Sequence, residues 1–318
     1  MGDPAGVGPE LIVKLSEYFE REKNAYVIYA EEKTIREAQR LLGKKIDFKK
    51  ISDLSEINSP GVYLVDLNIL KSAIVEPSVA SGRAAVAYLA RATADALRGS
   101  IQGILTMPIS KFWASKAGFK FPGQTEYLAH ASGVKDFAMA FYSEEIKLVL
   151  LTIHLPLREV FKEITKESIK RKAYLIDREF KRLFGYEPRI KVLGLNPHAG
   201  EKGELGKEEI EVIDPAIWEL REEGLKVEGP LVPDTAFLKR EKEDVFLAMY
   251  HDQGLIAFKL LAFDKGVNLT LGLPFVRTSP DHGTAYDIAW KGIASVGASL
   301  CALKLIEKVL DRSHTKIT

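Results

Sequence analysis

Short runs of apolar residues alternate along this chain with longer segments in which apolar positions recur at helical spacing. The apolar runs predict strands at 25–30, 62–67, 101–107, 147–153, 191–195, 245–250 and 266–277. The helical patterns cover 31–42, 81–99, 157–183, 207–223 and 293–310. Strands and helices that alternate with short connections are typical of an α/β fold, with a mainly parallel sheet and helices on both faces.

Three predicted strands run directly into a histidine. His154 follows 147–153, His198 follows 191–195, and His251 follows 245–250. In open α/β sheets ligands bind beyond the carboxyl ends of the strands, so these positions are expected to carry chemistry. Three neutral imidazoles with an open coordination position can hold a catalytic divalent metal. The spacing matches no short metal signature, so structural histidines remain the alternative.

Polar residues surround the third of these strand ends. Asp252 and Asp234 could orient a ligand histidine or move a proton. Lys259, two helical turns beyond His251, could supply a charge to a phosphate or carboxylate, or could simply extend into solvent. Asn268 and Arg277 lie at the two ends of the predicted strand 266–277, and arginine suits two-point contact with an oxyanion.

A glycine turn at residue 123 opens another predicted helix, with Gln124 and Thr125 near its cap. Capping is one reading, and binding of a phosphate or carboxylate is the other. The common nucleotide fingerprints, G-x-G-x-x-G and G-x-x-x-x-G-K-[ST], and the G-x-S-x-G elbow do not occur. Their absence disfavours a Rossmann dehydrogenase or a P-loop kinase.

Composition narrows the class of protein further. A chain of 318 residues suits two lobes better than one simple core. The net charge of +1 gives no reason to expect nucleic acid or a membrane surface as a partner. The single cysteine, Cys301, cannot form an internal disulfide, which fits a reducing, cytoplasmic location. No signal peptide or membrane span is predicted.

The stretch HGTAYDIA at 282–289 resembles the nucleotide loop of the isocitrate/isopropylmalate dehydrogenase superfamily. That superfamily binds NAD without a Rossmann fingerprint. The resemblance implies that His282 and the neighbouring backbone contact the adenine, and that Asp287 accepts hydrogen bonds from the adenosine ribose, favouring NAD over NADP. The implied cofactor-binding residues are His282, Gly283, Thr284, Ala285, Asp287 and Ile288.

Five further stretches widen the resemblance to most of the chain, from residue 2 to about residue 292. They are GDPAGVGPE, GQTEYLA, NPHAGEKGELGKEE, YHDQGL and GVNLTLGLPFVRTSPDHGTAYDIA. Together they resemble the 4-hydroxythreonine-4-phosphate dehydrogenase family. The resemblance implies a two-lobed α/β/α fold like that of isopropylmalate dehydrogenase. It places a discontinuous cofactor-side lobe at 1–110 plus 263–318, and a central lobe for metal, substrate and dimerisation at 111–262.

The family also implies an active site. One divalent metal ion (zinc, cobalt or magnesium) would be held by His154, His198 and His251, one of them from the partner subunit, so a homodimer with the site at its interface is expected. The implied substrate contacts are Gln124, Thr125, Lys259, Asn268 and Arg277. The implied reaction is NAD-dependent oxidation of 4-phosphohydroxy-L-threonine with decarboxylation to 3-amino-2-oxopropyl phosphate, a step of pyridoxal 5'-phosphate biosynthesis.

Two positions depart from the family pattern. Gln124 stands where GHTE usually has His, and a glutamine can hydrogen-bond but cannot titrate. Trp290 stands where DIAGKG has Gly. Because of Gln124, the alternative is a related dehydrogenase that acts on 4-phosphoerythronate, 4-phosphothreonate or a cis-diol. A catalytically silent metal- or nucleotide-binding protein is the alternative from another class, and metal-dependent NAD reduction separates the two.

Overall fold

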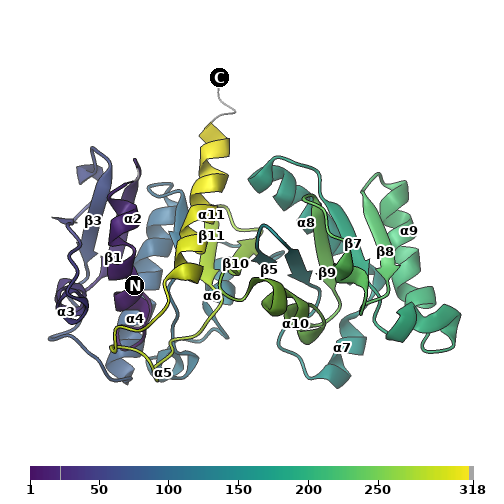
Figure 1. Ribbon diagram of the computed structural model, residues 1–318, viewed down its shortest axis with the longest axis horizontal. Helices are drawn as coiled ribbons and strands as arrows, with labels where there is room; N and C mark the ends of the chain where they lie inside the picture. Colours follow the sequence, from purple (N-terminus) through teal and green to yellow (C-terminus); the bar gives the residue numbers. More distant parts are fainter. Residues whose placement is uncertain (22, 315–318) are drawn as a thin grey trace. The chain divides into compact units, whose positions relative to one another are not determined.

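The computed structural model describes residues 1–21 and 23–314. The chain divides into two compact units, each with a mixture of helices and strands (Figure 1). Unit 1 comprises Met1–Gly133 and Pro274–Ile306, and unit 2 comprises Val134–Leu273 and Glu307–Thr318. The divisions between these compact units fall after residues 133, 273 and 306. The lobe boundaries near 110 and 262 that the sequence predicts stay a prediction.

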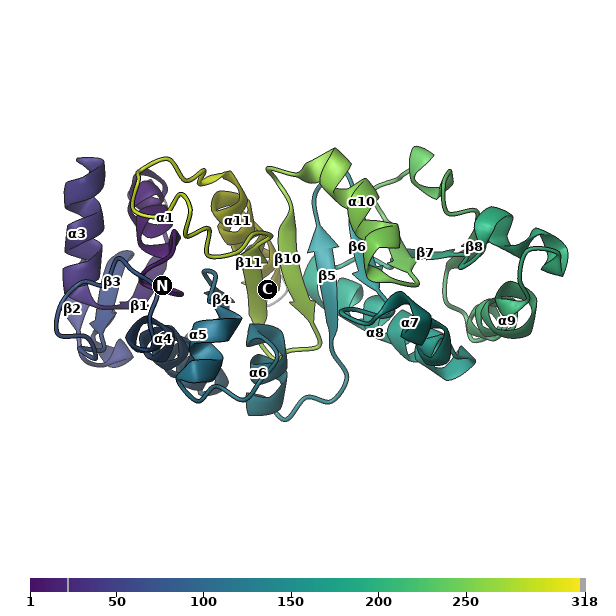
Figure 2. The same ribbon diagram turned by 90° about the horizontal axis from the view of Figure 1, so that it is seen from below.

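Unit 1 contains a three-stranded parallel sheet in the order β1-β3-β2. Its strands are β1 (Ala25–Ala30), β2 (Lys49–Ile51) and β3 (Gly61–Asp66). Figure 2 shows α1 (Gly8–Lys14) and α3 (Glu32–Leu42) on one side of these strands and α4 (Val79–Leu97) on the other. A parallel pair, β4 (Gly103–Leu105) and β11 (Val276–Pro280), joins segments far apart in the sequence.

Within unit 2 the strands follow the order β10-β5-β6-β9-β7-β8. They are β5 (Ala138–Tyr142), β6 (Lys147–Leu150), β7 (Arg189–Leu193), β8 (Val227–Leu231), β9 (Asp244–Ala248) and β10 (Val267–Leu271). Strands β6, β9, β7 and β8 are parallel, and β5 runs antiparallel to both of its neighbours. The short β5–β6 connection, closed by Ser143 N donating to Ile146 O, forces that reversal.

Helices cover both faces of the unit 2 sheet. Figure 2 shows α10 (His251–Ala262) on one side and α8 (Lys166–Phe184) on the other. The remaining helices are α2 (Ser16–Phe19), α5 (Lys111–Lys116), α6 (Gln124–Ala131), α7 (Leu157–Glu163), α9 (Asp214–Glu222) and α11 (Gly297–His314). Short helical turns are η1 (Leu54–Glu56), η2 (Pro197–Gly203), η3 (Glu209–Ile213) and η4 (Ala236–Leu238). The predicted α/β class is confirmed.

Two predicted elements are wrong in detail. The run 266–277 forms two strands, β10 and β11, rather than one, because Gly272 breaks it with φ +94°. A Cβ at Gly272 would lie 2.4 Å from Asp136 O, so only glycine fits this bend. The helical run 157–183 is likewise two helices, and Thr165 caps the second by accepting from Ser168 N.

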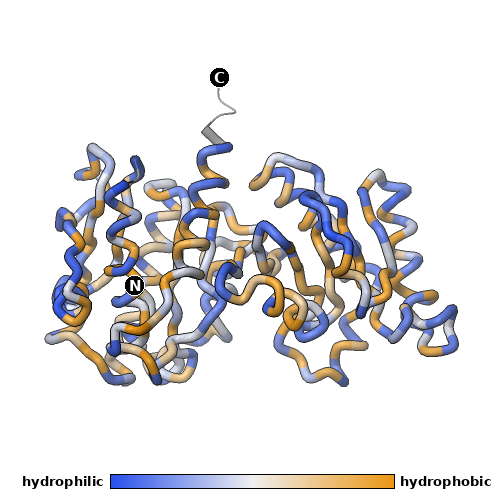
Figure 3. The backbone as a smooth tube through the Cα atoms, viewed as in Figure 1, coloured by the Kyte–Doolittle hydropathy of each residue, from blue (hydrophilic) through white to orange (hydrophobic). Residues whose placement is uncertain are grey.

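Each unit has its own apolar core. In unit 1 the core includes Leu11, Ile35 and Leu64, and in unit 2 it includes Leu148 and Phe246, all at most 1% exposed. Figure 3 shows hydrophobic segments along strands and polar segments along several outer helices. Among the helices described, none combines the length and the apolar run needed to cross a membrane.

Candidate active site

The three strands that precede the predicted metal ligands are direct neighbours in the sheet. β9 lies between β6 and β7 and is parallel to both. Their carboxyl ends therefore meet at one edge, and each leads into a histidine: His154 after β6, His198 after β7, and His251 at the start of α10 after β9. The topology thus places the predicted ligands where ligands bind in α/β sheets.

Two of the three histidines lie close together. The rings of His154 and His251 are 5.7 Å apart between centroids, with an interplanar angle of 43°. His198 does not complete a set, because the described residues contain no group of three His, Cys, Asp or Glu side chains that could hold a metal. Within the described residues, one chain therefore brings together a pair of imidazoles rather than a triad.

His251 is oriented by its neighbour in the sequence. His251 Nδ1 lies 2.6 Å from Asp252 Oδ1, and Asp252 is largely exposed. With Nδ1–H donated to the carboxylate, the ring has its Nε2 lone pair available to a ligand. An imidazole pair with a carboxylate behind one ring is a donor set that suits a divalent metal. Asp234, on the loop after β8, and Lys259, on α10, are both exposed.

Two residues that the sequence did not single out tie these strand ends together. Gln253 accepts from Met249 N (2.7 Å) and donates to Gly194 O (2.7 Å), which joins the ends of β9 and β7. Thr152 donates to Met249 O (2.7 Å), which joins the ends of β6 and β9. The only sequence signal was the position of Gln253 inside the stretch YHDQGL.

The backbone that carries His198 is left-handed. Residues 198–202 have φ between 41° and 79° and ψ between 0° and 55°. For residues with a Cβ this conformation costs roughly 1–2 kcal/mol each, and four of these five residues are not glycine. Such a run persists only where its surroundings enforce it, and here it begins with a predicted metal ligand.

Unit 1 buries a cation beside hydroxyl groups. Arg277, on β11, is 4% exposed. Its Nη2 and Nε donate to Thr106 Oγ1 (2.8 and 3.1 Å), and its Nη1 donates to Thr125 Oγ1 (3.2 Å). Burial lowers the pKa of Arg277 to about 10. A guanidinium held at a depressed pKa is stabilised by any anion that binds against it.

Two predicted substrate contacts have buried oxygens that make no hydrogen bond within the described chain. They are Gln124 Oε1 in unit 1 and Asn268 Oδ1 in unit 2. The amide nitrogen of Gln124 is fixed by donating to Met107 O (3.0 Å), so its oxygen is held in one place. Buried polar atoms are normally satisfied, so unsatisfied ones are candidates for ligand contact.

The predicted cofactor loop is attached to the N-terminal turn of unit 1. Tyr286 Oη donates to Asp3 Oδ2 (2.7 Å), and Trp290 Nε1 donates to Pro4 O (3.1 Å). Trp290 has φ +59°, a conformation that glycine adopts freely and tryptophan does not. His282 and Asp287 are exposed, so both are accessible to a cofactor.

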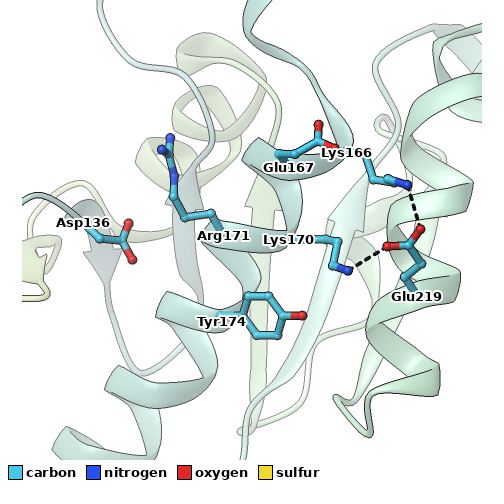
Figure 4. Close-up of a pocket in the computed structure, with 7 residues that line it drawn as sticks. All are labelled: Asp136, Lys166, Glu167, Lys170, Arg171, Tyr174 and Glu219. Carbon is cyan, nitrogen blue, oxygen red and sulfur yellow. Dashed lines mark hydrogen bonds and ion pairs between the residues drawn. The ribbon is translucent and has the colours of Figure 1, made fainter.

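One surface pocket of about 500 Å³ lies over α8 and α9 (Figure 4). Lys166 and Lys170 each contact Glu219 at 2.7 Å, so the charge of these lysines is largely compensated. Among the described residues that line it, none is a predicted site residue. We therefore do not assign the reaction to this pocket.

Fold and site together define an α/β enzyme with candidate metal and anion sites. The chain belongs to the family described as pyridoxal phosphate biosynthetic protein PdxA, whose model matches residues 22–306. A 4-hydroxythreonine-4-phosphate dehydrogenase from Aquifex aeolicus is 65% identical, over 98% of this chain and 97% of that protein. A D-threonate 4-phosphate dehydrogenase from Salmonella typhimurium is 38% identical, over 96% of each chain.

Solved structures agree with this assignment. The crystal structure of 4-hydroxythreonine-4-phosphate dehydrogenase from Klebsiella pneumoniae matches with a TM-score of 0.85 and 38% identity, over 97% of each chain. The predicted family is confirmed, and so is the prediction of a dehydrogenase.

Proposed function

We propose that this enzyme oxidises 4-phosphohydroxy-L-threonine with NAD and a divalent metal, and that the β-keto acid formed loses carbon dioxide to give 3-amino-2-oxopropyl phosphate. The observation that carries the proposal is the His154–His251 pair, with Asp252 behind it, at the carboxyl ends of adjacent parallel strands. This cytoplasmic role, in pyridoxal 5'-phosphate biosynthesis, is compatible with a single free cysteine.

His154, His198 and His251 are the proposed ligands of one zinc, cobalt or magnesium ion. A bound divalent ion supplies a Lewis acid that polarises the substrate alcohol and lowers the barrier to its deprotonation. Asp252 fixes the tautomer of His251 through the 2.6 Å contact at Nδ1. Asp252, Asp234 and Lys259 are the proposed groups for proton handling, and the exposure of all three leaves them accessible to substrate.

The substrate phosphate is proposed to bind through cationic and hydroxyl groups. In unit 1 these are Arg277 and Thr125, already hydrogen-bonded to each other, with the unsatisfied oxygen of Gln124 as acceptor for a substrate donor. Lys259 and Asn268, whose Oδ1 is likewise unsatisfied, are the other proposed substrate contacts. An arginine that is already buried and hydrogen-bonded loses little further conformational entropy when an anion binds.

NAD is proposed to bind the loop that is attached to the N-terminal turn, where it supplies the hydride acceptor. The proposed contacts are His282, Gly283, Thr284, Ala285, Asp287 and Ile288. Thr284 O accepts from Val7 N (3.0 Å) and Ala285 O accepts from Ala289 N (2.9 Å), so this loop has a fixed backbone before any cofactor arrives. The exposed Asp287 carboxylate suits ribose hydroxyls and repels a 2'-phosphate.

We further propose a homodimer in which the partner subunit supplies His198 to the His154–His251 pair. Two observations support it. The described chain does not gather all three histidines by itself. The helix that begins at His251, together with the residue that follows it, also exposes an apolar stripe of Ile256 (64%), Leu260 (83%) and Phe263 (75%). Figure 3 shows the hydrophobic character of α10. Exposed apolar surface of this kind is typical of subunit contacts.

A related substrate is the second candidate. Gln124 cannot donate or accept a proton as a histidine would, and relatives acting on D-threonate 4-phosphate are also similar to this chain over most of its length. The alternative substrates are therefore 4-phosphoerythronate, 4-phosphothreonate or a cis-diol.

The deciding experiment is NADH formation by the purified protein with 4-phosphohydroxy-L-threonine, with chelator and with added zinc, cobalt or magnesium. Metal-dependent turnover that His251→Ala abolishes is the expected result. Turnover only with a phosphorylated sugar acid would contradict the first function and support the second candidate. Bound metal and NAD without turnover of any substrate would contradict both.

A further inference from the structure

The left-handed segment 198–202 requires a structural cause. Its residues include His198, Ala199, Glu201 and Lys202, each with positive φ. The segment contains no proline, and only Gly200 adopts this conformation without steric cost. Contacts outside the segment must therefore hold it.

One buried carboxylate binds the chain immediately before this segment, in addition to backbone hydrogen bonds such as Ala199 N to Asn196 O (3.1 Å) and Leu205 N to Gly200 O (3.1 Å). Glu209, the first residue of η3, is 1% exposed. Its Oε1 accepts from Leu195 N (2.7 Å) and Asn196 N (2.7 Å), and its Oε2 accepts from the Asn196 side-chain amide (2.9 Å). These three hydrogen bonds fix the backbone immediately before the left-handed segment.

Three glycines in and around the left-handed segment leave space for the carboxylate and its partner Asn196. A Cβ at Gly200 would lie 2.7 Å from Glu209 Oε2, and one at Gly194 would lie 3.2 Å from Glu209 Oε1. A Cβ at Gly206 would lie 2.3 Å from the Asn196 amide nitrogen that Glu209 binds. Gly200, within the segment, and Gly194, just before it, therefore pack against the carboxylate.

The negative charge of Glu209 is met by N–H donors. A carboxylate has two acceptor oxygens and no donor, so both oxygens can accept from the strand end at once. Glutamine would keep one acceptor but would turn an N–H₂ group toward the Asn196 amide.

We propose that Glu209 is a positioning residue, whose buried carboxylate holds the left-handed segment that presents His198 for metal binding. The proposal rests on the proposed function, because it takes His198 to be a metal ligand. It assigns a role to a residue that contacts neither metal nor substrate. A loop held in one conformation before metal arrives presents its imidazole without an ordering cost at the moment of binding.

The test compares Glu209→Gln and Glu209→Ala with Glu211→Gln in the full-length protein. Glu211 is an exposed carboxylate two residues along the same turn and serves as the matched control. Amide hydrogen exchange of Leu195 and Asn196 in the metal-free protein reports whether their hydrogen bonds to Glu209 are intact. Titration with Co²⁺, followed by its visible absorption, reports metal affinity. The His198→Ala variant gives the affinity that remains when the His198 imidazole is removed.

We expect Glu209→Ala to speed exchange at these two amides about tenfold and to weaken Co²⁺ binding about 10- to 100-fold. Glu209→Gln, which is isosteric, should fall between Glu209→Ala and wild type, and Glu211→Gln should match wild type. Wild-type Co²⁺ affinity in the folded fraction of both Glu209 variants would overturn the proposal, since a merely structural role lowers the melting temperature alone.

The same measurements separate this inference from the proposed function. If His198→Ala leaves Co²⁺ affinity unchanged, the metal assignment of His198 is wrong, and the exchange rates of the metal-free protein still decide whether Glu209 holds the loop. If His198→Ala weakens binding and the Glu209 variants do not, only the positioning role is overturned.

Discussion

His251 Nδ1 and Asp252 Oδ1 lie 2.6 Å apart, although the two residues are adjacent in sequence. This contact sets which ring nitrogen of His251 carries the proton and leaves the other for a ligand. The His154 ring is 5.7 Å away between centroids, so one carboxylate orients one of two paired imidazoles.

Replacing Asp252 with alanine is therefore expected to weaken metal binding by about 10- to 100-fold, because the His251 ring loses its orienting acceptor. Isothermal titration with zinc or Co²⁺ measures this directly. Asp264→Ala, which removes an exposed carboxylate just beyond the same helix, is the control. Equal losses in the two variants would show that general charge, rather than the contact with His251, is responsible.

Replacing Arg277 with methionine is expected to raise the KM for the phosphorylated substrate by about 10- to 100-fold, as loss of a charged hydrogen-bonding group predicts. Inorganic phosphate should raise the melting temperature of the wild type and not that of the variant. Arg40→Met, at an exposed arginine of unit 1, should retain the phosphate effect. Stabilisation of Arg277→Met by phosphate would locate the anion site elsewhere.

Replacing Arg277 with methionine should also change how the free energy of unfolding depends on pH. Burial lowers the pKa of Arg277 to about 10 in the folded state, well below the usual value for arginine. The charged form therefore disfavours folding, by about 3 kcal/mol, at every pH below about 10. As pH rises above about 10 the folded state releases this proton before the unfolded chain does, and the penalty shrinks. The difference in unfolding free energy between wild type and Arg277→Met should be constant from neutral pH to about 9 and then change in favour of the wild type.

Trp290 combines a strained backbone with a favourable side chain. Trp290→Gly relieves about 1 kcal/mol of left-handed strain at φ +59°. It loses the hydrogen bond to Pro4 O, about 1 kcal/mol, and about 2 kcal/mol of apolar burial. Urea denaturation should show a net destabilisation of about 2 kcal/mol, against about 1 kcal/mol for Trp290→Phe. A glycine variant more stable than the phenylalanine variant would contradict this balance.

Mixing two inactive variants tests the proposed sharing of the metal site between subunits. His198→Ala and His251→Ala should each be inactive alone. In a mixed dimer one site contains both defects and the other contains neither, so refolding the two together should restore about a quarter of wild-type activity. No recovery, in dimers shown to have exchanged subunits, would place all three ligands in one chain.

The apolar stripe on α10 makes a separate prediction about assembly. Leu260→Glu puts a charge on the most exposed residue of that stripe, at 83%, and should convert the dimer to monomer in analytical ultracentrifugation. Leu97→Glu, at a 44% exposed leucine of α4, should leave the mass unchanged. A dimeric, active Leu260→Glu protein would exclude α10 from the contact.

Much of this molecule follows from local patterns in the sequence. Alternating apolar runs and helical periodicity predicted the α/β class, and the run 245–250 corresponds closely to β9. The family was predicted from short stretches such as HGTAYDIA and YHDQGL and is confirmed. These patterns are readable because strand burial and helix amphipathicity have fixed periods along a chain.

The tertiary structure decided what depends on partners distant in the chain. It divided 266–277 at Gly272, where Asp136 O leaves no space for a side chain. It placed β9 between β6 and β7, which brings His154 beside His251, and it gave Glu209 its hydrogen bonds to the strand end before His198. The types of residue and their spacing indicate which chemistry is available. Only packing in three dimensions decides which groups meet, because each such contact depends on which distant segments fold against each other.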